Sequence, residues 1–154
     1  MDVGTGSGAI AIAIARVAPA SEVWATDNSR SAVTLAEANV RRHELQDRVT
    51  VVHGDLIAPV PGPIDLVVAN LPYLPIADAA NYPELAGEPS TALFGAADGL
   101  GAYRRLLEAC KGRLAGDASV VIQLHRSVLA ANVSDLRRLR AQLDGFTSRL
   151  AAAA

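Results

Sequence analysis

The hydrophobic and polar positions of this chain follow two periodicities. Short apolar runs bounded by polar or Gly residues are typical of buried strands, whereas apolar residues three or four apart are typical of helices with one buried face. The runs predict strands over residues 1–3, 22–27, 49–53, 64–69, 119–124 and 146–153. The helical spacing predicts helices over residues 9–17, 30–43, 100–114 and 127–143. This alternation predicts an α/β fold with a doubly wound, mostly parallel sheet.

Each of the first three predicted helices has an apolar face that we expect to pack on the sheet. These faces carry Ile10, Ile14 and Val17, then Val33, Ala36 and Val40, then Tyr103, Leu106, Leu107, Cys110 and Leu114. Asn28 and Ser29 can cap the second helix, and Gly116-Asp117 predicts a turn into the next strand. A long irregular segment over 74–99 interrupts the alternation, and such long loops in compact domains are usually functional or disordered.

Composition supports one globular domain over residues 1–154. The chain has 51% hydrophobic and 19% charged residues and a net charge of −2, which disfavours a nucleic-acid substrate because such partners usually leave a strong basic footprint. No apolar run is long enough to span a bilayer, so we expect no membrane partner. The single cysteine, Cys110, falls on an apolar helical face and is expected to be a buried core thiol, consistent with a cytoplasmic protein.

The Gly-rich stretch near the start is the first candidate for chemistry. Asp2 ends a short apolar run, and Gly4, Gly6 and Gly8 follow at alternate positions before the first predicted helix. Glycine lets the backbone turn sharply and approach a ligand closely, while the helix N-terminus favours negative charge. The stretch therefore predicts a nucleotide-type site. The loose dinucleotide fingerprint of a dehydrogenase and a plain Gly-rich turn are the alternatives at this point.

Polar residues follow three further predicted strands. Asp27 lies where a carboxylate can accept hydrogen bonds from ribose hydroxyls, although it can equally cap the next helix. Asp55 can accept from an adenine amino group or simply serve a turn after Gly54. His53 and His125 have no carboxylate or cysteine cluster at metal spacing, so we expect them to be structural and expect no metal site.

Asn70-Leu71-Pro72-Tyr73, directly after the fourth predicted strand, is the sharpest signal. Pro72 fixes φ and has no N–H, which makes a rigid rim beside the Gly-rich loop. The Asn70 side-chain oxygen and a backbone carbonyl can hold an amino group with its lone pair directed at an electrophile, and Tyr73 can pack on the planar group. An ordinary strand-terminating turn is the alternative.

These residues resemble known motifs. Asp2–Gly8 resembles motif I of S-adenosylmethionine-dependent methyltransferases, and Asn70–Tyr73 resembles the Asn-Pro-Pro-Tyr motif of enzymes that methylate planar amino or amide nitrogens. The blocks Glu88-Pro89-x-x-Ala92-Leu93 and Asp98-Gly99-Leu100-x-x-Tyr103-Arg104 are similar to those of the HemK/PrmC family, which methylates the glutamine side-chain nitrogen of peptide chain release factors. The resemblance covers nearly the whole chain.

The resemblance implies a class I, Rossmann-like methyltransferase domain that uses S-adenosylmethionine and acts on a protein, namely a release factor. It implies that Asn70, Pro72 and Tyr73 hold the acceptor nitrogen, with no metal involved. The cofactor contacts it implies are Asp2, Gly4, Thr5, Gly6, Gly8, Asp27, Asp55, Leu56 and Asn70.

The chain departs from the family pattern in several places. Leu71 replaces the first proline of the motif, and Gln123-Leu124-His125 stands where the family usually has a glutamate followed by a glycine. We expect the chain to be truncated at both ends and to lack the N-terminal helical domain that family members use for docking to release factors. A nucleic-acid amino-group methyltransferase and a non-catalytic cofactor-binding remnant are therefore the alternatives, whereas a dehydrogenase does not explain the Asn70–Tyr73 rim.

Overall fold

The computed structural model describes residues 1–74, 97–124, 134, 137 and 147–152, with backbone alone for 147–152. The predicted helix over 127–143 and His125 therefore fall largely or wholly outside the described residues, as does most of the irregular segment. The strands are β1 (Asp2–Val3), β2 (Val23–Asp27), β3 (Val49–His53), β4 (Ile64–Ala69), β5 (Leu114–Leu124) and β6 (Thr147–Ala152). The helices are α1 (Ala9–Val17), α2 (Arg30–Arg42) and α4 (Gly101–Cys110). None of these helices is long and apolar enough to cross a membrane.

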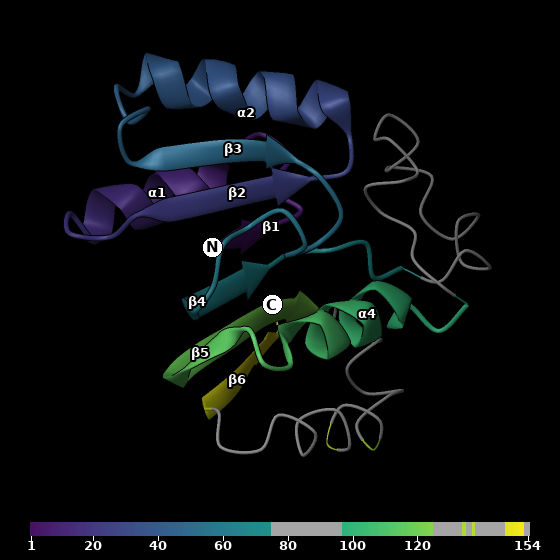
Figure 1. The fold of residues 1–154 in the computed structure, drawn as a ribbon. Coiled ribbons are helices and arrows are strands. Elements are labelled where there is room, and N and C mark those ends of the chain that lie inside the picture. Colours follow the sequence, from purple (N-terminus) through teal and green to yellow (C-terminus); the bar gives the residue numbers. More distant parts are fainter. Residues whose placement is uncertain (75–96, 125–133, 135–136, 138–146, 153–154) are drawn as a thin grey trace.

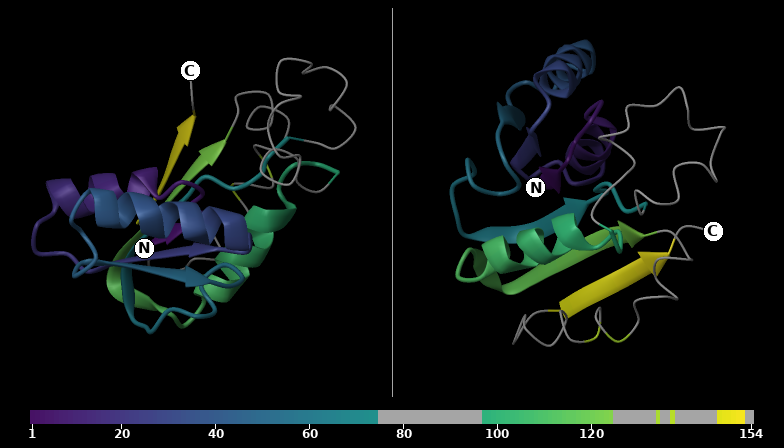
Figure 2. Two further views of the ribbon diagram at one scale, coloured as in Figure 1. Left: turned by 90° about the horizontal axis from the view of Figure 1, so that it is seen from above. Right: turned by 90° about the vertical axis from the view of Figure 1, so that its right-hand side faces the viewer.

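All six strands are parallel and form one sheet in the order β3-β2-β1-β4-β5-β6 (Figure 1). Helices α1 and α2 cover one face of this sheet and α4 covers the other (Figure 2). This arrangement confirms the predicted doubly wound α/β fold. Parallel strands joined by crossover helices need both faces covered, which explains why the strands are nearly continuous apolar runs.

The order of strands reverses between β1 and β4. From β1 the chain moves outward through β2 and β3, then returns to β4 on the other side of β1 and continues outward through β5. Asp2 pairs with Ala25 and Val68, and Val3 pairs with Thr26 and Ala69, so the two residues of β1 bridge both halves of the sheet. Ligands of open α/β sheets bind outside the carboxyl ends of the strands at such a reversal.

Two apolar clusters, one on each face of the sheet, form the core. On one face α4 packs through Tyr103, Leu106, Leu107 and Cys110 against residues that include Val67 of β4. The opposite face buries residues of α1 and α2 against β2 and β3: Ala11, Ile12, Ala15, Val23, Ala25, Val40 and Val49.

The predicted inward face of α1 is confirmed only for Ile14, which is half-buried and packs against the core cluster, whereas that of α2 is largely confirmed. In α1 the buried residues are Ala11, Ile12 and Ala15, while Val17 is 82% exposed. Helix α1 also starts close to α2, since a Cβ on Gly8 would lie 3.3 Å from Ala36. In α2, Ala36 and Val40 are buried as expected.

The third predicted helix ends earlier than expected. Helix α4 stops at Cys110, and Gly112 then takes φ 68°, a left-handed conformation that breaks the helix. Leu114, expected on the helix, instead begins β5. The turn predicted at Gly116-Asp117 is also wrong, because both residues lie within β5. The Gly116-Asp117 pattern instead coincides with an irregularity in the sheet, because the pairing register of β5 with β4 shifts between Leu114 and Ser119.

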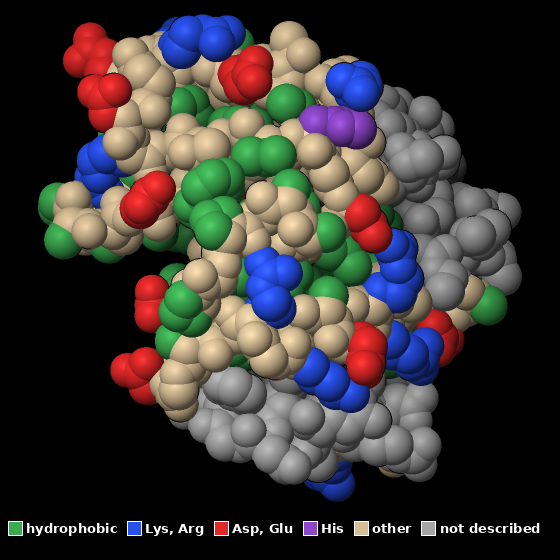
Figure 3. Space-filling view, viewed as in Figure 1, with side chains coloured by type: hydrophobic (Ala, Val, Ile, Leu, Met, Phe, Trp, Pro, Cys, Tyr) green, Lys and Arg blue, Asp and Glu red, His purple; other side chains and the backbone are tan. Residues whose placement is uncertain are grey.

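Strand β1 is shorter than its neighbours, as expected, with two residues against five in β2 and six in β4. The amino group of Met1 donates to the carbonyl of Leu66 and so takes the place of a strand amide. Figure 3 shows that the molecule is hollowed at this edge, between the connection from α1 to β2 and the beginning of β4.

We predict that Gly8→Ala destabilises the fold more than Gly112→Ala. Both residues have positive φ, 83° and 68°, so both variants incur the left-handed penalty of about 1–2 kcal/mol. Only Gly8 also faces a neighbour, Ala36 at 3.3 Å, whereas nothing lies within 4 Å of a Cβ at Gly112. Overpacking should add about 1–3 kcal/mol to the Gly8 variant. Urea unfolding measures the difference, and equal losses would contradict the role of this contact.

Candidate active site at the reversal of strand order

The Gly-rich loop leaves β1 and turns over the end of β2. The amides of Gly4 and Thr5 both donate to the carbonyl of Thr26, at 2.9 and 3.0 Å. Gly4, Gly6 and Gly8 have φ of 71°, 54° and 83°, which L residues rarely adopt. Gly8 is the N-cap of α1 and offers no side chain to its first amides. Apart from its chain neighbours, no atom of the described residues lies within 4 Å of where a Cβ of Gly6 would be, so the loop has a side that these residues leave open.

The Asp2 side chain anchors the Gly-rich loop through hydrogen bonds. Its side chain is completely buried, and its Oδ2 accepts hydrogen bonds from Thr5 Oγ1 at 2.6 Å and from the Ala11 amide at 3.1 Å. Its Oδ1 is buried with no partner among the residues that the structure describes. Burial raises the pKa of Asp2, against the hydrogen bonds from Thr5 and Ala11, which lower it. The carboxylate therefore joins the loop to α1, and a direct contact with cofactor stays a prediction.

Asp27 joins the same loop to the next helix. Its Oδ2 accepts the Gly6 amide at 2.9 Å, and its Oδ1 accepts the Ser29 amide at 2.9 Å. The cap of α2 is Ser29, whose Oγ accepts from the Ala32 amide, so Asp27 is not the cap and Asn28 is not needed as one. The carboxylate thus lies beside the Gly-rich loop at the end of β2, where the sequence predicts a ribose-binding acid.

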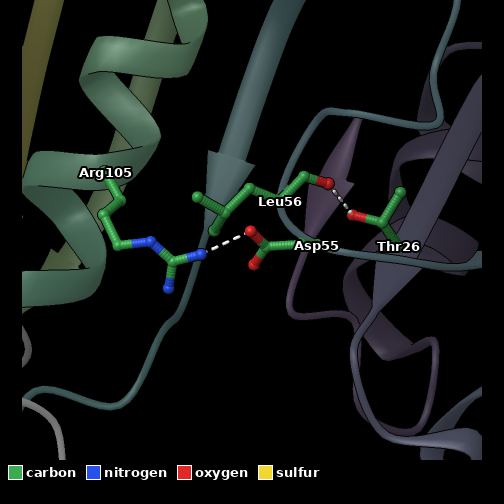
Figure 4. A network of polar contacts seen from close by, with 4 residues as sticks. All are labelled: Thr26, Asp55, Leu56 and Arg105. Atoms are coloured by element: carbon green, nitrogen blue, oxygen red, sulfur yellow. Dashed lines mark hydrogen bonds and ion pairs between the residues drawn. The ribbon is translucent and has the colours of Figure 1, made fainter.

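The third strand end carries Asp55 and Leu56. Asp55 forms an ion pair with Arg105 of α4, and both side chains are more than half exposed (Figure 4). Leu56 has φ 50°, and its carbonyl accepts a hydrogen bond from Thr26 Oγ1 at 2.7 Å, which ties this turn to β2. The pairing with Arg105 gives Asp55 a role that sequence analysis did not anticipate, and its contact with an adenine amino group stays a prediction.

Residues 70–73, named here the acceptor rim, follow β4. Asn70 is exposed, and its side chain has no hydrogen-bond partner in the described part of the chain. Leu71 is 6% exposed, and its Cδ2 lies 2.7 Å from where a Cβ of Gly4 would be. The rim therefore lies directly against the Gly-rich loop, as predicted from the positions of the two motifs. Tyr73 is half-buried and packs against the core cluster beneath α4.

Two further candidates from the sequence, His53 and Cys110, lie among the described residues. His53 is exposed, and its Nε2 lies 3.1 Å from the Asn28 carbonyl oxygen. Among the described residues no group of three or more His, Cys, Asp or Glu side chains could hold a metal ion. Cys110 is buried, as expected, and burial raises the pKa of its thiol to about 11.

Sequence analysis missed four residues that support the site. Thr26 accepts from the Gly-rich loop and holds Leu56, and Asn39 Nδ2 donates to the Ser7 carbonyl at 2.8 Å. Arg105 pairs with Asp55, and Tyr103 bonds the backbone of Leu71. Of these four roles, only that of Tyr103 had a signal in the sequence. Leu71 stands where the resembling motif has proline, so it brings a backbone N–H that needs a partner.

Taken together, the six-stranded parallel sheet, the Gly-rich loop and an acid at the end of β2 define an α/β protein of the doubly wound class, in which ligands bind outside the carboxyl ends of the strands. A family model described as "Methyltransferase small domain" matches residues 1–81, more than half of the chain. The chain belongs to this methyltransferase family.

Relatives and a solved structure agree with the family. The chain is 47% identical over 115 residues to a release factor glutamine methyltransferase of Moorella thermoacetica, covering 73% of this chain and 41% of the relative. It is 39% identical over 126 residues to a ribosomal protein uL3 glutamine methyltransferase of Bordetella pertussis, covering 80% and 42%. A ribosomal protein L11 methylase of Lactobacillus delbrueckii superposes with a TM-score of 0.59 at 25% identity, covering 92% of this chain and 56% of that one.

These relatives confirm the resemblance to the glutamine methyltransferases and the class I fold. The chain spans about two fifths of the length of these two curated relatives, 41% and 42%.

We predict that Asp2 makes stability fall as pH rises. Burial raises its pKa above the ordinary 3.8, so the folded chain binds this proton more tightly than the unfolded chain. The free energy of unfolding therefore decreases with rising pH through the interval above 3.8, and Asp2→Asn removes that decrease. Urea unfolding at about pH 4.5 and about pH 7.5 measures it, with exposed Asp47→Asn as the charge-matched control. Parallel pH profiles for the parent and Asp2→Asn would contradict the effect of burial.

Proposed function

We propose that this chain is the catalytic domain of a cytoplasmic S-adenosylmethionine-dependent methyltransferase that methylates the glutamine side-chain amide nitrogen of a peptide chain release factor. One observation carries the proposal: the acceptor rim contacts the Gly-rich loop at Gly4, at the point where the strand order reverses. A cofactor held by the loop and an amide held by the rim would therefore be neighbours.

The residues around the loop fit S-adenosylmethionine. The open side of Gly6 leaves room for a ligand beside the loop. The Ala11 amide of α1 is bonded to Asp2, but Gly8 gives the two amides before it no side-chain cap, so these can meet a carboxylate such as that of the methionine moiety. Asp27 has acceptor capacity left for ribose hydroxyls, because each of its carboxylate oxygens accepts one hydrogen bond from the described residues and can accept a second. Asp2, Thr5, Asp55 and Leu56 shape the loop and the adjoining turn.

The acceptor rim has the most demanding role in the proposed reaction. An amide nitrogen is a poor nucleophile because its lone pair is delocalised, and bound S-adenosylmethionine supplies an electrophilic methyl group on a sulfonium. The Asn70 side-chain oxygen and the Pro72 carbonyl accept hydrogen bonds from the two N–H groups of the amide, which favours a pyramidal nitrogen as positive charge develops. Tyr73 packs on the plane of the amide and orients it. The nitrogen would form a bond to the methyl carbon while the carbon–sulfur bond of the sulfonium breaks and leaves S-adenosylhomocysteine, and the amide proton would then pass to water; this route requires no metal.

The names of the relatives leave two protein substrates to compare. The Moorella thermoacetica relative is named for release factors and the Bordetella pertussis relative for ribosomal protein uL3. We favour a release factor, because the similarity to the former is higher. Methylation assays on a release factor and on uL3 in parallel decide between them. Transfer to nucleic acid but not to protein would favour the amino-group alternative, and cofactor binding without any transfer would indicate a non-catalytic remnant.

We predict that Asp27→Ala weakens binding of S-adenosylmethionine and S-adenosylhomocysteine. Loss of charge-assisted hydrogen bonds to the ribose should cost about 1.5–3 kcal/mol, or roughly ten- to 150-fold in affinity. Calorimetry measures the affinity. Asp47→Ala, an exposed acid just before β3 at the other end of the sheet, is the control of equal charge. An Asp27→Ala variant that binds as tightly as Asp47→Ala would rule out the ribose contact.

We predict that Asn70→Ala separates catalysis from cofactor binding. Its side chain is proposed to hold the acceptor nitrogen, so cofactor affinity should stay within about threefold while methyl transfer falls about 10²–10³-fold, as when one preorganised polar group is removed. Tyr73→Ala should also slow transfer. The double variant should fall well short of the product of the two losses, because both residues act on one bound amide.

The measurement is single-turnover methylation of a Gly-Gly-Gln peptide at saturating cofactor, with calorimetry on each variant. Gln46→Ala, an exposed amide on the opposite edge of the sheet, is the control. If Asn70→Ala transfers methyl at the rate of Gln46→Ala, the rim is structural and the amide-methyltransferase proposal is wrong for this chain.

A further inference from the structure

Tyr103 of α4 places its hydroxyl between the acceptor rim and the end of β5. The side chain is completely buried, and its ring belongs to the core cluster beneath α4. Its Oη accepts the amide of Leu71 at 3.1 Å, and it lies 2.5 Å from the carbonyl oxygen of Gln123 and 3.0 Å from that of Leu71. A hydroxyl has one proton, so it donates to one of these carbonyls at a time while it accepts from Leu71.

The Leu71 amide needs this partner. Leu71 is 6% exposed, and the bond from its amide to the tyrosine hydroxyl is buried. A buried N–H without a partner costs about 1–3 kcal/mol. A proline at this position would bring no N–H, so the leucine creates a demand that the Tyr103 hydroxyl meets.

The hydroxyl also connects two strand ends that carry the site. The Leu71 amide lies between Asn70 and Pro72, whose oxygens are proposed to hold the acceptor. Gln123 is near the end of β5, the strand that pairs with β4. A bond from Leu71 to Tyr103 and on to Gln123 therefore fixes the rim backbone relative to the rigid sheet, without any contact between Tyr103 and the substrate.

We propose that Tyr103 is a positioning residue that sets the orientation of the acceptor rim. The assignment rests on the proposed function, because it concerns the geometry in which the rim presents an amide. Without the hydroxyl the Leu71 amide is free to turn away from its buried position. The Asn70 oxygen and the Pro72 carbonyl then no longer converge, although the rim is still present.

The test compares Tyr103→Phe with the parent chain. Phenylalanine keeps the ring in the core and removes the hydroxyl alone. We expect single-turnover transfer to a Gly-Gly-Gln peptide, at saturating cofactor, to fall roughly 10- to 100-fold, while cofactor affinity stays within about threefold. Ser21→Ala, which removes a hydroxyl bonded to the Ala18 carbonyl at the opposite end of the sheet, should leave transfer unchanged. Transfer by Tyr103→Phe at the rate of Ser21→Ala overturns the proposal.

A second variant distinguishes positioning from a general loss of packing. Leu71→Pro removes the N–H that the hydroxyl accepts. In the Leu71→Pro background, Tyr103→Phe should slow methyl transfer by less than about one fifth of the factor by which it slows the parent, because no unsatisfied amide is created. Equal fold-losses in the two backgrounds overturn the proposal.

Amide hydrogen exchange keeps this proposal separate from the proposed function. Tyr103→Phe should speed exchange of the Leu71 amide at least about tenfold while the amides of β2 exchange as in the parent. If the parent chain transfers no methyl group, the proposed function fails, and exchange alone then decides the role of Tyr103. Unchanged exchange at Leu71 overturns the positioning role, whatever the activity.

Discussion

The two halves of the sheet meet at β1. Asp2 and Val3 form all of β1, and each pairs with β2 on one side and with β4 on the other. Asp2 has a second task, because its buried carboxylate accepts from Thr5 and Ala11 and thereby sets the path of the Gly-rich loop into α1. The hydrogen bonding that holds the sheet together and the hydrogen bonding that shapes the site therefore meet in one residue, whose burial raises its pKa.

This constraint divides the site into two parts with different supports. The Gly-rich loop and Asp27 depend on β1, β2 and α2, whereas the acceptor rim depends on β4, β5 and α4. The parts touch where the Leu71 side chain lies over Gly4. A side chain at position 4 would push that leucine away, so Gly4 is needed for contact between the parts as much as for its positive φ. The division matches the two functions proposed for the site, binding of a methyl donor and presentation of an amide.

The fold and the location of the site could be predicted because both depend on local patterns. Polar residues after apolar runs mark the strand ends, and parallel strands bring those ends to one edge. The inner face of α1 could be predicted only in part, because its Ala and Ile residues suit either side, and Ala11, Ile12 and Ala15 are the ones that are buried. The pairing of Arg105 with Asp55 joins residues fifty positions apart, and no local pattern marks such a pair.

The chain contains one cysteine, and it lies in the core beneath the acceptor half of the site. Burial raises the pKa of Cys110 to about 11, so at neutral pH the thiol is protonated as well as inaccessible. Thiolate is the reactive form, and a thiol reagent can therefore modify this chain only when α4 separates from the sheet. Cys110 is thus a built-in chemical reporter on the packing of α4, and its labelling rate follows opening of that half of the molecule without any introduced probe.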